Sequence, residues 1–385
     1  MIGRHQPPVS STITARSLVR AIAPALGAGA GELSILGTEL QRAFGANSVA
    51  LVDSGTSALA IALTATAHVG GVVALPAYAC VDVGAAAIFA KLRVRLYDID
   101  PVTLSPDLES VSRVLSHGVD AIVVAHLYGY PANVPGVAAL AASHGVSVIE
   151  DAAQSAWGML LETRLGAFGP LSVLSFGRGK GMTGGGGGAL LGFGAREAAM
   201  IESASSRLLG AKSCVRTLAF AKAQWLLGRP SLYGIPSAIP GLHLGETIYH
   251  PAHEPRAITR VSASLVRDAL SRAEADLAVR QRHAEELGRS VDRAKGLLAI
   301  RAIPGSNPGY LRLPVRVTDA RRVQHALGVV RGYPNTLADL TELRPFLVGD
   351  EKISGARDLQ RTLVTLPTHG MLTAADLRDL TVWMG

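Results

Sequence analysis

The sequence contains very few cysteines and no long uninterrupted apolar run. Cys80 and Cys214 are the two cysteines among 385 residues, so no disulfide framework can form and the chain suits a reducing compartment. The most apolar window, VGGVVALPAYACVDVGAAAIFA, is interrupted by Pro76 and Asp82, which favours a strand, a loop and a helix over a membrane span. The first residues also lack the apolar stretch of a secretion signal. We therefore expect a cytoplasmic protein.

Charged and aromatic residues are also scarce, at 17% and 5% of the chain. A hydrophobic fraction of 48% nevertheless excludes a disordered chain and suits a compact α/β protein. The net charge of +7 comes mainly from arginines spread over expected helices, and no nucleic-acid-binding module is recognisable, so we expect no nucleic-acid partner. An anionic small substrate or an acidic membrane surface would use the same positive charge.

Strand and helix patterns alternate along the first half of the chain. Strands are expected over 47–55, 70–76, 93–100, 121–129, 146–153 and 171–176, with helices in the intervals. This alternation predicts right-handed crossovers and a mostly parallel sheet. Beyond residue 195 the pattern is mainly helical, with one long helix expected over 258–294, and residues 310–369 suggest a smaller α+β domain. We expect a large domain over residues 1–250 and a small one over 251–385.

The stretch DSGTSAL, residues 53–59, lies between an expected strand and an expected helix. It places Ser54, Gly55, Thr56 and Ser57 at the start of that helix. Backbone N–H groups at a helix N-terminus, with a hydroxyl alongside, bind anions such as phosphate. Ser and Thr are also ordinary helix caps, so the stretch alone is either a phosphate site or a simple cap.

Two further stretches place chemically useful side chains after strands. VIEDAAQSAWG, residues 148–158, contains Asp151 and Gln154; a carboxylate here suits a protonated ring nitrogen, with a helix-capping aspartate as the alternative. SFGRGKGMTGGGGGALL, residues 175–191, contains Ser175 and Lys180 before five glycines. Glycine costs conformational entropy and is used where the backbone turns sharply or approaches something closely. The alternative for Lys180 is an ordinary solvated side chain.

The three stretches together predict a cofactor. Ligands of parallel sheets bind at the carboxyl ends of the strands, where all three lie. A phosphate cradle, a carboxylate for a ring nitrogen and an amine are the parts that a pyridoxal phosphate site requires. An amine held as a Schiff base also loses the proton that its ordinary pKa, about 10.4, would retain at neutral pH. The sequence therefore predicts pyridoxal 5'-phosphate as cofactor and gives no indication of a metal.

Four stretches resemble, in order and spacing, the DegT/DnrJ/EryC1/StrS family of pyridoxal-phosphate sugar aminotransferases. They are DSGTSAL, AHLYGYPANVPGVAALAASHGVSVIEDAAQSAWG, GAFGPLSVLSFGRGKGMTGGGGGALL and LVTLPTHGMLTAADL, and the likeness is best over residues 35–195. The resemblance implies pyridoxal-phosphate fold type I, an α/β fold with a mostly parallel sheet in the large domain and a smaller C-terminal α+β domain. It also implies a homodimer whose active site is shared across the interface.

The resemblance also implies roles for individual residues. Lys180 matches the Schiff-base lysine, Asp151 the partner of the pyridinium nitrogen, and Gln154 the residue that contacts the ring oxygen of the cofactor. Phosphate binding falls to a turn and one serine: Gly55, Thr56, Ser57 and Ser175. Arg178, two residues before the lysine, is expected either to bind an acidic substrate or to be a solvated side chain.

The sequence departs from the family pattern at several positions. Cys80 stands where an aromatic residue commonly stacks on the cofactor, and Tyr78 nearby is expected either to replace it or to belong to the core. Gly186 stands where a glutamate is common. HEPRAITRVSASL lacks the usual Gly-x-Asn-x-Arg, so the partner-subunit contact to phosphate does not transfer, and GYPNTLADL lies where the family has His-Tyr. His126 matches a loop near the site, with a structural histidine as the alternative.

The expected function is transfer of an amino group from an amino acid, such as glutamate, to a keto group on a nucleotide-linked sugar or a similar intermediate, in polysaccharide or secondary-metabolite biosynthesis. A sugar dehydratase on the same fold is one alternative, although a histidine replaces the lysine in those members of the family. A non-catalytic cofactor-binding regulator or scaffold is another. Residues 205–245, rich in Leu, Trp, Tyr, Pro and basic side chains, are expected to pack at a dimer interface or to lie on a membrane surface.

Overall fold

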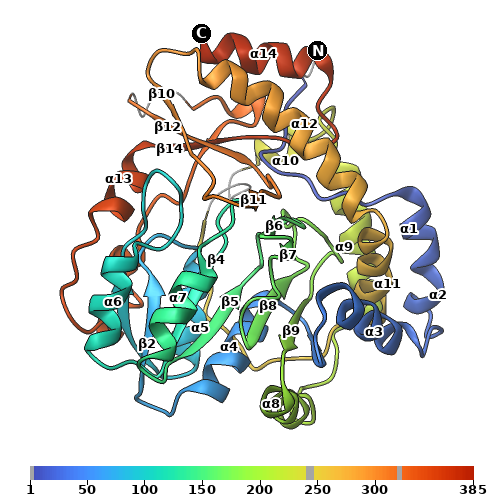
Figure 1. Ribbon diagram of the computed structural model, residues 1–385. Coiled ribbons are helices and arrows are strands. Elements are labelled where there is room, and N and C mark those ends of the chain that lie inside the picture. The colour runs from blue at the N-terminus through green and yellow to red at the C-terminus, as the bar shows by residue number, and fades with distance from the viewer. Residues whose placement is uncertain (1–3, 240–246, 319–322) are drawn as a thin grey trace.

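A seven-stranded sheet forms the centre of the molecule. The computed structural model describes residues 4–239, 247–318 and 323–385 (Figure 1). The sheet has the order β1-β9-β8-β5-β4-β2-β3, in which β9 runs antiparallel to both neighbours and the remaining pairs are parallel. Its strands are β1 (Ser48–Val52), β2 (Val72–Pro76), β3 (Arg93–Tyr97), β4 (Ala121–Ala125), β5 (Ser147–Asp151), β8 (Leu171–Ser175) and β9 (Gly188–Gly192). The expectation of a mostly parallel sheet is confirmed.

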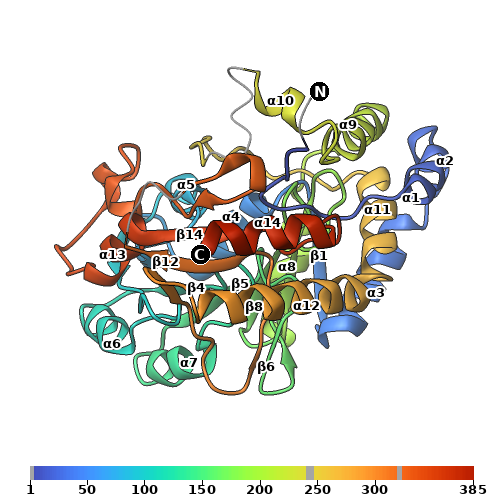
Figure 2. The same cartoon turned by 90° about the horizontal axis from the view of Figure 1, so that it is seen from above.

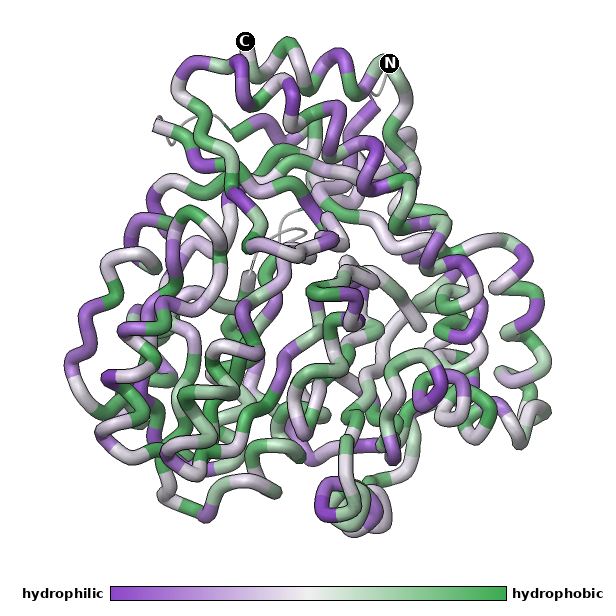
Figure 3. Tube along the Cα trace, in the orientation of Figure 1, coloured by the Kyte–Doolittle hydropathy of each residue, from purple (hydrophilic) through white to green (hydrophobic). Residues whose placement is uncertain are grey.

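Helices cover both faces of this sheet. α4 (Gly55–Thr66) and α5 (Val81–Phe89) pack together on one face, and α6 (Leu108–Ser116) and α7 (Val134–Ala142) pack together on the other (Figure 2). Every residue of β4 is buried, as expected for a parallel strand that is covered on both sides. The outer helices alternate between hydrophilic and hydrophobic stretches (Figure 3), which matches burial of one helix face.

The prediction of one uninterrupted helix over 258–294 is wrong. The structure has α11 (Arg260–Leu270) and α12 (Ala273–Val291), separated at Ser271 and Arg272. Arg272 has φ −113° and ψ 1°, outside the helical region, and its guanidinium bonds both Asp268 and the carbonyl of Thr12. The break allows α11 to pack against α3 (Glu32–Phe44) while α12 crosses to the second sheet. Helical periodicity continues through such a break, so the sequence does not reveal it.

The C-terminal part forms a smaller antiparallel sheet. Its strand order is β10-β12-β14-β13, with β10 (Leu297–Ala299), β12 (Leu313–Val317), β13 (Val330–Arg331) and β14 (Leu363–Leu366). α12, α13 (Ser354–Thr362) and α14 (Ala374–Met384) accompany this sheet, which has its own buried cluster of side chains. A short sheet of β11 (Ser306–Asn307), β6 (Met159–Leu160) and β7 (Thr163–Arg164) lies between the two larger sheets.

Between the central sheet and α11 the chain is mainly helical. It contains α8 (Ala195–Ser205), α9 (Cys214–Leu227) and the short α10 (Gly234–Ser237). Residues 240–245 of the apolar and basic segment 205–245 lie outside the described residues. No helix in the part of the chain that the structure describes is both long and apolar enough to cross a bilayer.

Residues 4–12, here called the N-terminal strap, precede α1 (Ala15–Arg20) and connect the two sheets. Arg4 forms an ion pair with Asp376, and the carbonyl of Pro7 accepts a hydrogen bond from His369 Nε2 at 2.9 Å. At the other end of the strap, Ser11 Oγ donates to the carbonyl of Lys180. The strap therefore contacts both the C-terminal elements and the loop that carries the candidate lysine.

Candidate active site

The expected phosphate turn forms at the carboxyl ends of β1 and β8. Ser54 caps α4, and its Oγ accepts a hydrogen bond from the Ser57 amide at 2.9 Å. The amides of Gly55 and Thr56 have no acceptor within the helix, because they belong to its first turn. A Cβ on Gly55 would lie 2.8 Å from Ser175 Cβ. The structure therefore brings all four residues of the expected phosphate site together and leaves room for no side chain at position 55.

Asp151 and Lys180 lie close enough to interact electrostatically. Asp151 ends β5, and its Oδ1 accepts a hydrogen bond from the Ala153 amide at 3.0 Å. Burial raises the pKa of Asp151, while that hydrogen bond and the charge of Lys180 act in the opposite direction. Lys180 is half-buried in the loop between β8 and β9, and its amine makes no ion pair with any described residue. A carboxylate and an available amine thus share one neighbourhood.

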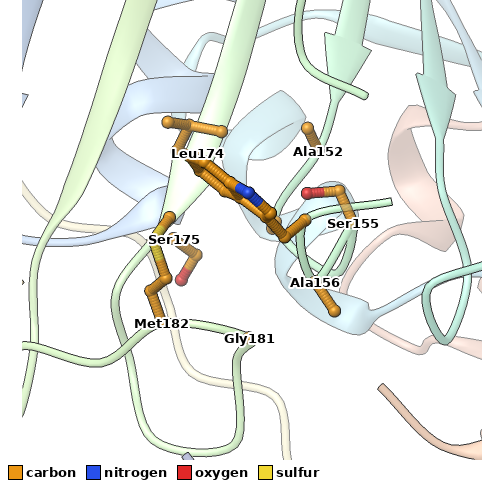
Figure 4. Close-up of a pocket in the computed structure, with 9 residues that line it drawn as sticks. Ala152, Ser155, Ala156, Leu174, Ser175, Gly181 and Met182 are labelled. Atoms are coloured by element: carbon orange, nitrogen blue, oxygen red, sulfur yellow. The ribbon is translucent and has the colours of Figure 1, made fainter. Parts of the chain in front are cut away.

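One glycine in this loop and another at the start of β9 lie so close to neighbouring backbone that no side chain fits. A Cβ on Gly181 would lie 2.5 Å from Ala156 Cα, and a Cβ on Gly188 would lie 2.6 Å from the carbonyl carbon of Ser54. The loop therefore packs against the turns that carry the phosphate site and the residues after Asp151. Figure 4 shows the small cavity at this contact, lined by Ser155, Ala156, Leu174, Ser175, Gly181 and Met182 among others.

Gln154 connects two tyrosines that the sequence does not assign to the site. Its Oε1 accepts a hydrogen bond from the Tyr128 amide at 3.0 Å, and its Nε2 donates to Tyr333 Oη. Tyr333 comes from GYPNTLADL, the segment whose correspondence to the family is unclear from the sequence. No local sequence pattern assigns Tyr333 to the site, because its contact with Gln154 joins distant parts of the chain.

His126 has both ring nitrogens engaged by the protein. Its Nδ1 accepts a hydrogen bond from the Ala132 amide at 2.9 Å, so Nε2 carries the proton and donates to Glu150 Oε1 at 2.8 Å. The side chains of His126 and Glu150 are fully buried. Glu150 also accepts hydrogen bonds from three backbone amides and from Ser172 Oγ. This arrangement favours the structural alternative for His126, which holds Glu150, the residue before Asp151.

Cys80 and Arg178 lie at the edge of the site. Cys80 is the residue before α5, and burial together with Asp82 raises the pKa of its thiol to about 12, so the thiol stays protonated at neutral pH. Lys180 is within electrostatic range of Cys80. Arg178 is exposed and interacts electrostatically with Tyr233 near α10. A Cβ on Gly186 would have no heavy atom within 4 Å, so the residue that replaces the common glutamate lies in open space.

The residues present fit a phosphorylated pyridine aldehyde. The first turn of α4 offers amides without acceptors beside Ser175, and position 55 admits no Cβ. Asp151 and Lys180 supply the carboxylate and the amine in one neighbourhood, and Gln154 lies between tyrosines at the same strand ends. This donor set is the one that pyridoxal phosphate requires.

Comparisons with known proteins agree with this geometry. The chain is 32% identical over 124 residues to the UDP-N-acetyl-3-dehydro-alpha-D-glucosamine 3-aminotransferase of Acidithiobacillus ferrooxidans, covering 32% of this chain and about a third (34%) of that relative. It is 27% identical over 364 residues to the L-glutamine:2-deoxy-scyllo-inosose aminotransferase of Streptomyces lividus, covering 86% of this chain and 80% of the relative.

Solved structures show the same fold. The aminotransferase TlmJ from Streptoalloteichus hindustanus superposes with a TM-score of 0.76 at 21% identity, covering 100% of this chain and 97% of that one. The E. coli GDP-4-keto-6-deoxy-D-mannose-3-dehydratase with bound hydrated pyridoxal phosphate superposes with a TM-score of 0.79 at 16% identity, covering both chains fully (100% each). Residues 32–331 match the model of one family. The chain therefore belongs to the DegT/DnrJ/EryC1/StrS aminotransferase family, whose cofactor is pyridoxal phosphate.

Proposed function

We propose that the protein transfers an amino group from an amino acid, such as glutamate, to a keto group on a nucleotide-linked sugar or a similar keto sugar. One observation carries this proposal: Lys180 and Asp151 interact beside the turn in which Gly55 meets Ser175. The names of the relatives, which act on a UDP-linked sugar and on 2-deoxy-scyllo-inosose, support a keto-sugar acceptor in polysaccharide or secondary-metabolite biosynthesis.

Each residue of the site has a chemical role in this proposal. When bound, pyridoxal phosphate withdraws electrons from the carbon that carries the reacting amino group. Lys180 would hold the cofactor, and its amine, once released, is a base that takes a proton from the substrate and returns it. Asp151 would keep the ring nitrogen protonated, because burial raises the pKa of this carboxyl and a cation beside it stabilises the charged carboxylate. The first turn of α4 with Ser175 would hold the phosphate.

The cofactor can be tested by its colour. We expect the purified protein to absorb visible light, and Lys180→Ala to lose this band after dialysis. Lys222→Ala removes an exposed lysine from α9 and should retain the wild-type spectrum. A wild-type protein that stays colourless after incubation with pyridoxal phosphate would refute the proposal.

A half-reaction separates catalysis from binding. A transferase converts its bound aldehyde to the amine form when given glutamate, and the visible band disappears without any acceptor. A regulator or scaffold would keep the band. The structural similarity to a sugar dehydratase makes dehydration of a keto sugar the second candidate, and release of water without uptake of an amino group would identify it.

We also propose that the protein is a cytoplasmic homodimer and that a second copy covers α9 and α10. Val215, Phe220 and Ile235 are exposed to 61%, 56% and 44%, and exposed apolar patches mark interaction surfaces. Light scattering should report a dimer for the wild type and a monomer for Phe220→Asp. Retention of Phe220→Asp as a dimer, or binding of the wild type to anionic vesicles, would favour the membrane alternative.

A further inference from the structure

Arg312 is a half-buried arginine without a carboxylate partner. It precedes β12, and within the described residues its guanidinium makes one hydrogen bond, from Nη1 to Thr365 Oγ1 at 3.3 Å. Arg316, four residues later, instead pairs with Asp358, and Arg95 pairs with Glu351 at 2.7 Å. Charged side chains that leave water are normally paired. Arg312 therefore differs from these arginines in retaining its capacity to bind an anion.

Tyr128 places a second donor next to Arg312. A hydrogen bond from the Arg312 amide to the Tyr128 carbonyl, at 3.4 Å, joins the two residues. The Tyr128 side chain also lies close enough to the guanidinium to interact with it electrostatically. Tyr128 is 3% exposed. Its hydroxyl oxygen lies beside the Tyr78 hydroxyl, which accepts a hydrogen bond from the Tyr333 amide and is oriented to donate to Tyr128, whereas the Tyr128 proton has no acceptor among the described residues. Burial raises the pKa of Tyr128 to about 12, so the hydroxyl remains protonated and can donate to an anion.

The backbone holds Tyr128 in this position at an energetic cost. Its φ of 55° lies in the left-handed region, which is unfavourable for a residue with a large side chain. Gln154 Oε1 fixes the Tyr128 amide, and the following residue, Gly129, packs so closely on the neighbouring segment that a Cβ would lie 2.7 Å from the amides of Tyr310 and Leu311. Strain of this kind is found at binding and catalytic sites.

The pair borders the proposed cofactor site. Gln154 bonds both the Tyr128 amide and Tyr333 Oη, and the rings of Tyr128 and Tyr333 have centroids 5.6 Å apart. Tyr333 interacts electrostatically with Asp151 and Cys80, and Cys80 with Lys180. Arg312 and Tyr128 thus face the site from the side of the small sheet.

We propose that Arg312 and Tyr128 form a carboxylate-binding subsite of the active site. The inference deepens the proposed function and rests on it, because it assigns a chemical class to the substrate bound there. A guanidinium binds the two oxygens of a carboxylate through two parallel hydrogen bonds, and the hydroxyl adds a third donor. One guanidinium balances the single charge of a carboxylate, whereas a phosphate dianion in a half-buried site would remain undercompensated. The carboxylate belongs either to the amino donor or to an acidic acceptor.

Binding of glutarate, a dicarboxylate without an amino group, tests the subsite independently of turnover. Calorimetry on the cofactor-loaded protein should show binding of glutarate and none of the uncharged glutaramide. Arg312→Gln should weaken glutarate binding by at least about thirtyfold, and Tyr128→Phe by about tenfold. Arg312→Lys should recover part of the loss, since it restores the charge without the two-pronged geometry. Arg344→Gln removes an exposed charge from the same lobe and should match the wild type.

The source of the carboxylate follows from the two half-reactions. If the donor supplies it, Arg312→Gln will raise the glutamate concentration needed to bleach the visible band; if the acceptor supplies it, only the second half-reaction will change. Both results support the subsite. Equal glutarate affinity of wild type, Arg312→Gln and Tyr128→Phe would overturn it, even if the wild type binds pyridoxal phosphate and transfers amino groups. A protein that binds glutarate through Arg312 but never binds the cofactor would instead refute the proposed function alone.

Discussion

Replacing Glu150 with glutamine should destabilise the protein strongly although the two side chains have the same shape. Glu150 Oε2 accepts hydrogen bonds from the amides of Phe168 and Gly169 and from Ser172 Oγ, and Oε1 accepts from the Gly166 amide and His126 Nε2. In Glu150→Gln the amide oxygen can accept the three hydrogen bonds that Oε2 accepts in the wild type. The NH2 group then takes the place of Oε1, where it cannot accept from the Gly166 amide or from His126 Nε2.

Neither of these two donors can find another acceptor by a local change. His126 cannot change its tautomer, because Nδ1 already accepts a hydrogen bond from the Ala132 amide, and the Gly166 amide is part of the backbone. Two buried donors without an acceptor, at about 1–3 kcal/mol each, give roughly 2–6 kcal/mol. That is a large fraction of the 5–15 kcal/mol by which proteins of ordinary stability are folded.

Urea unfolding at pH 7 followed by tryptophan fluorescence measures this loss. Glu109→Gln is the matched control, because its side chain is 89% exposed and its loss should change stability by about 0.5 kcal/mol or less. The pKa of Glu150 is lowered by His126 and the backbone amides against the effect of burial, so its contribution is present above the ordinary glutamate pKa and is lost as the pH falls through the lowered value. If Glu150→Gln unfolds within 1 kcal/mol of the wild type at neutral pH, the reasoning fails.

Two further predictions concern the packing of the C-terminal part. A Cβ on Gly332 would lie 2.1 Å from Tyr78 Oη, so Gly332→Ala should lower the free energy of unfolding by about 1–3 kcal/mol. Adding Tyr78→Phe should recover part of this loss, and Gly37→Ala, whose Cβ would lie in open space, is the control. If urea unfolding shows that the effects of Gly332→Ala and Tyr78→Phe are simply additive, the clash is disproved. Burial lowers the pKa of His369 to about 4, so between pH 6.5 and 4 the unfolded state binds more protons than the folded state. The free energy of unfolding, relative to that of His369→Gln, should therefore fall by roughly 3 kcal/mol as the pH is lowered over that range. Parallel plots of stability against pH for the two proteins would contradict a buried neutral imidazole.

Local patterns were enough to predict six of the seven strands of the central sheet, but not β9 (Gly188–Gly192), which follows the glycine run and has little strand character of its own. Each βα unit there combines an apolar strand with a helix of matching periodicity, so neighbouring residues carry the information. The break between α11 and α12 was not predictable in this way, since it depends on Arg272 reaching Asp268 and the distant Thr12 carbonyl. The domain boundary near residue 250 remains a prediction.

The candidate site could be predicted where its residues follow strands in motifs. Asp151, Lys180 and the Gly55 turn belong to this group, and the structure brings them together. Tyr128, Arg312 and Tyr333 could not be assigned, because their contacts join segments roughly 200 residues apart in the chain. The sequence offered one signal for Arg312, a basic residue at the start of an apolar strand. That signal does not reveal the neighbouring Tyr128, which only the structure places beside Arg312.

The N-terminal strap connects the loop of the candidate lysine, Lys180, to the C-terminal elements of the molecule. Ser11 is attached to the peptide of Lys180, while Arg4 and Pro7 are attached to Asp376 and His369. A movement of the small sheet relative to the central sheet would therefore be transmitted to the lysine backbone through the strap. The position of the small sheet and the placement of the amine would then be coupled, and removing the contacts of the strap would uncouple them.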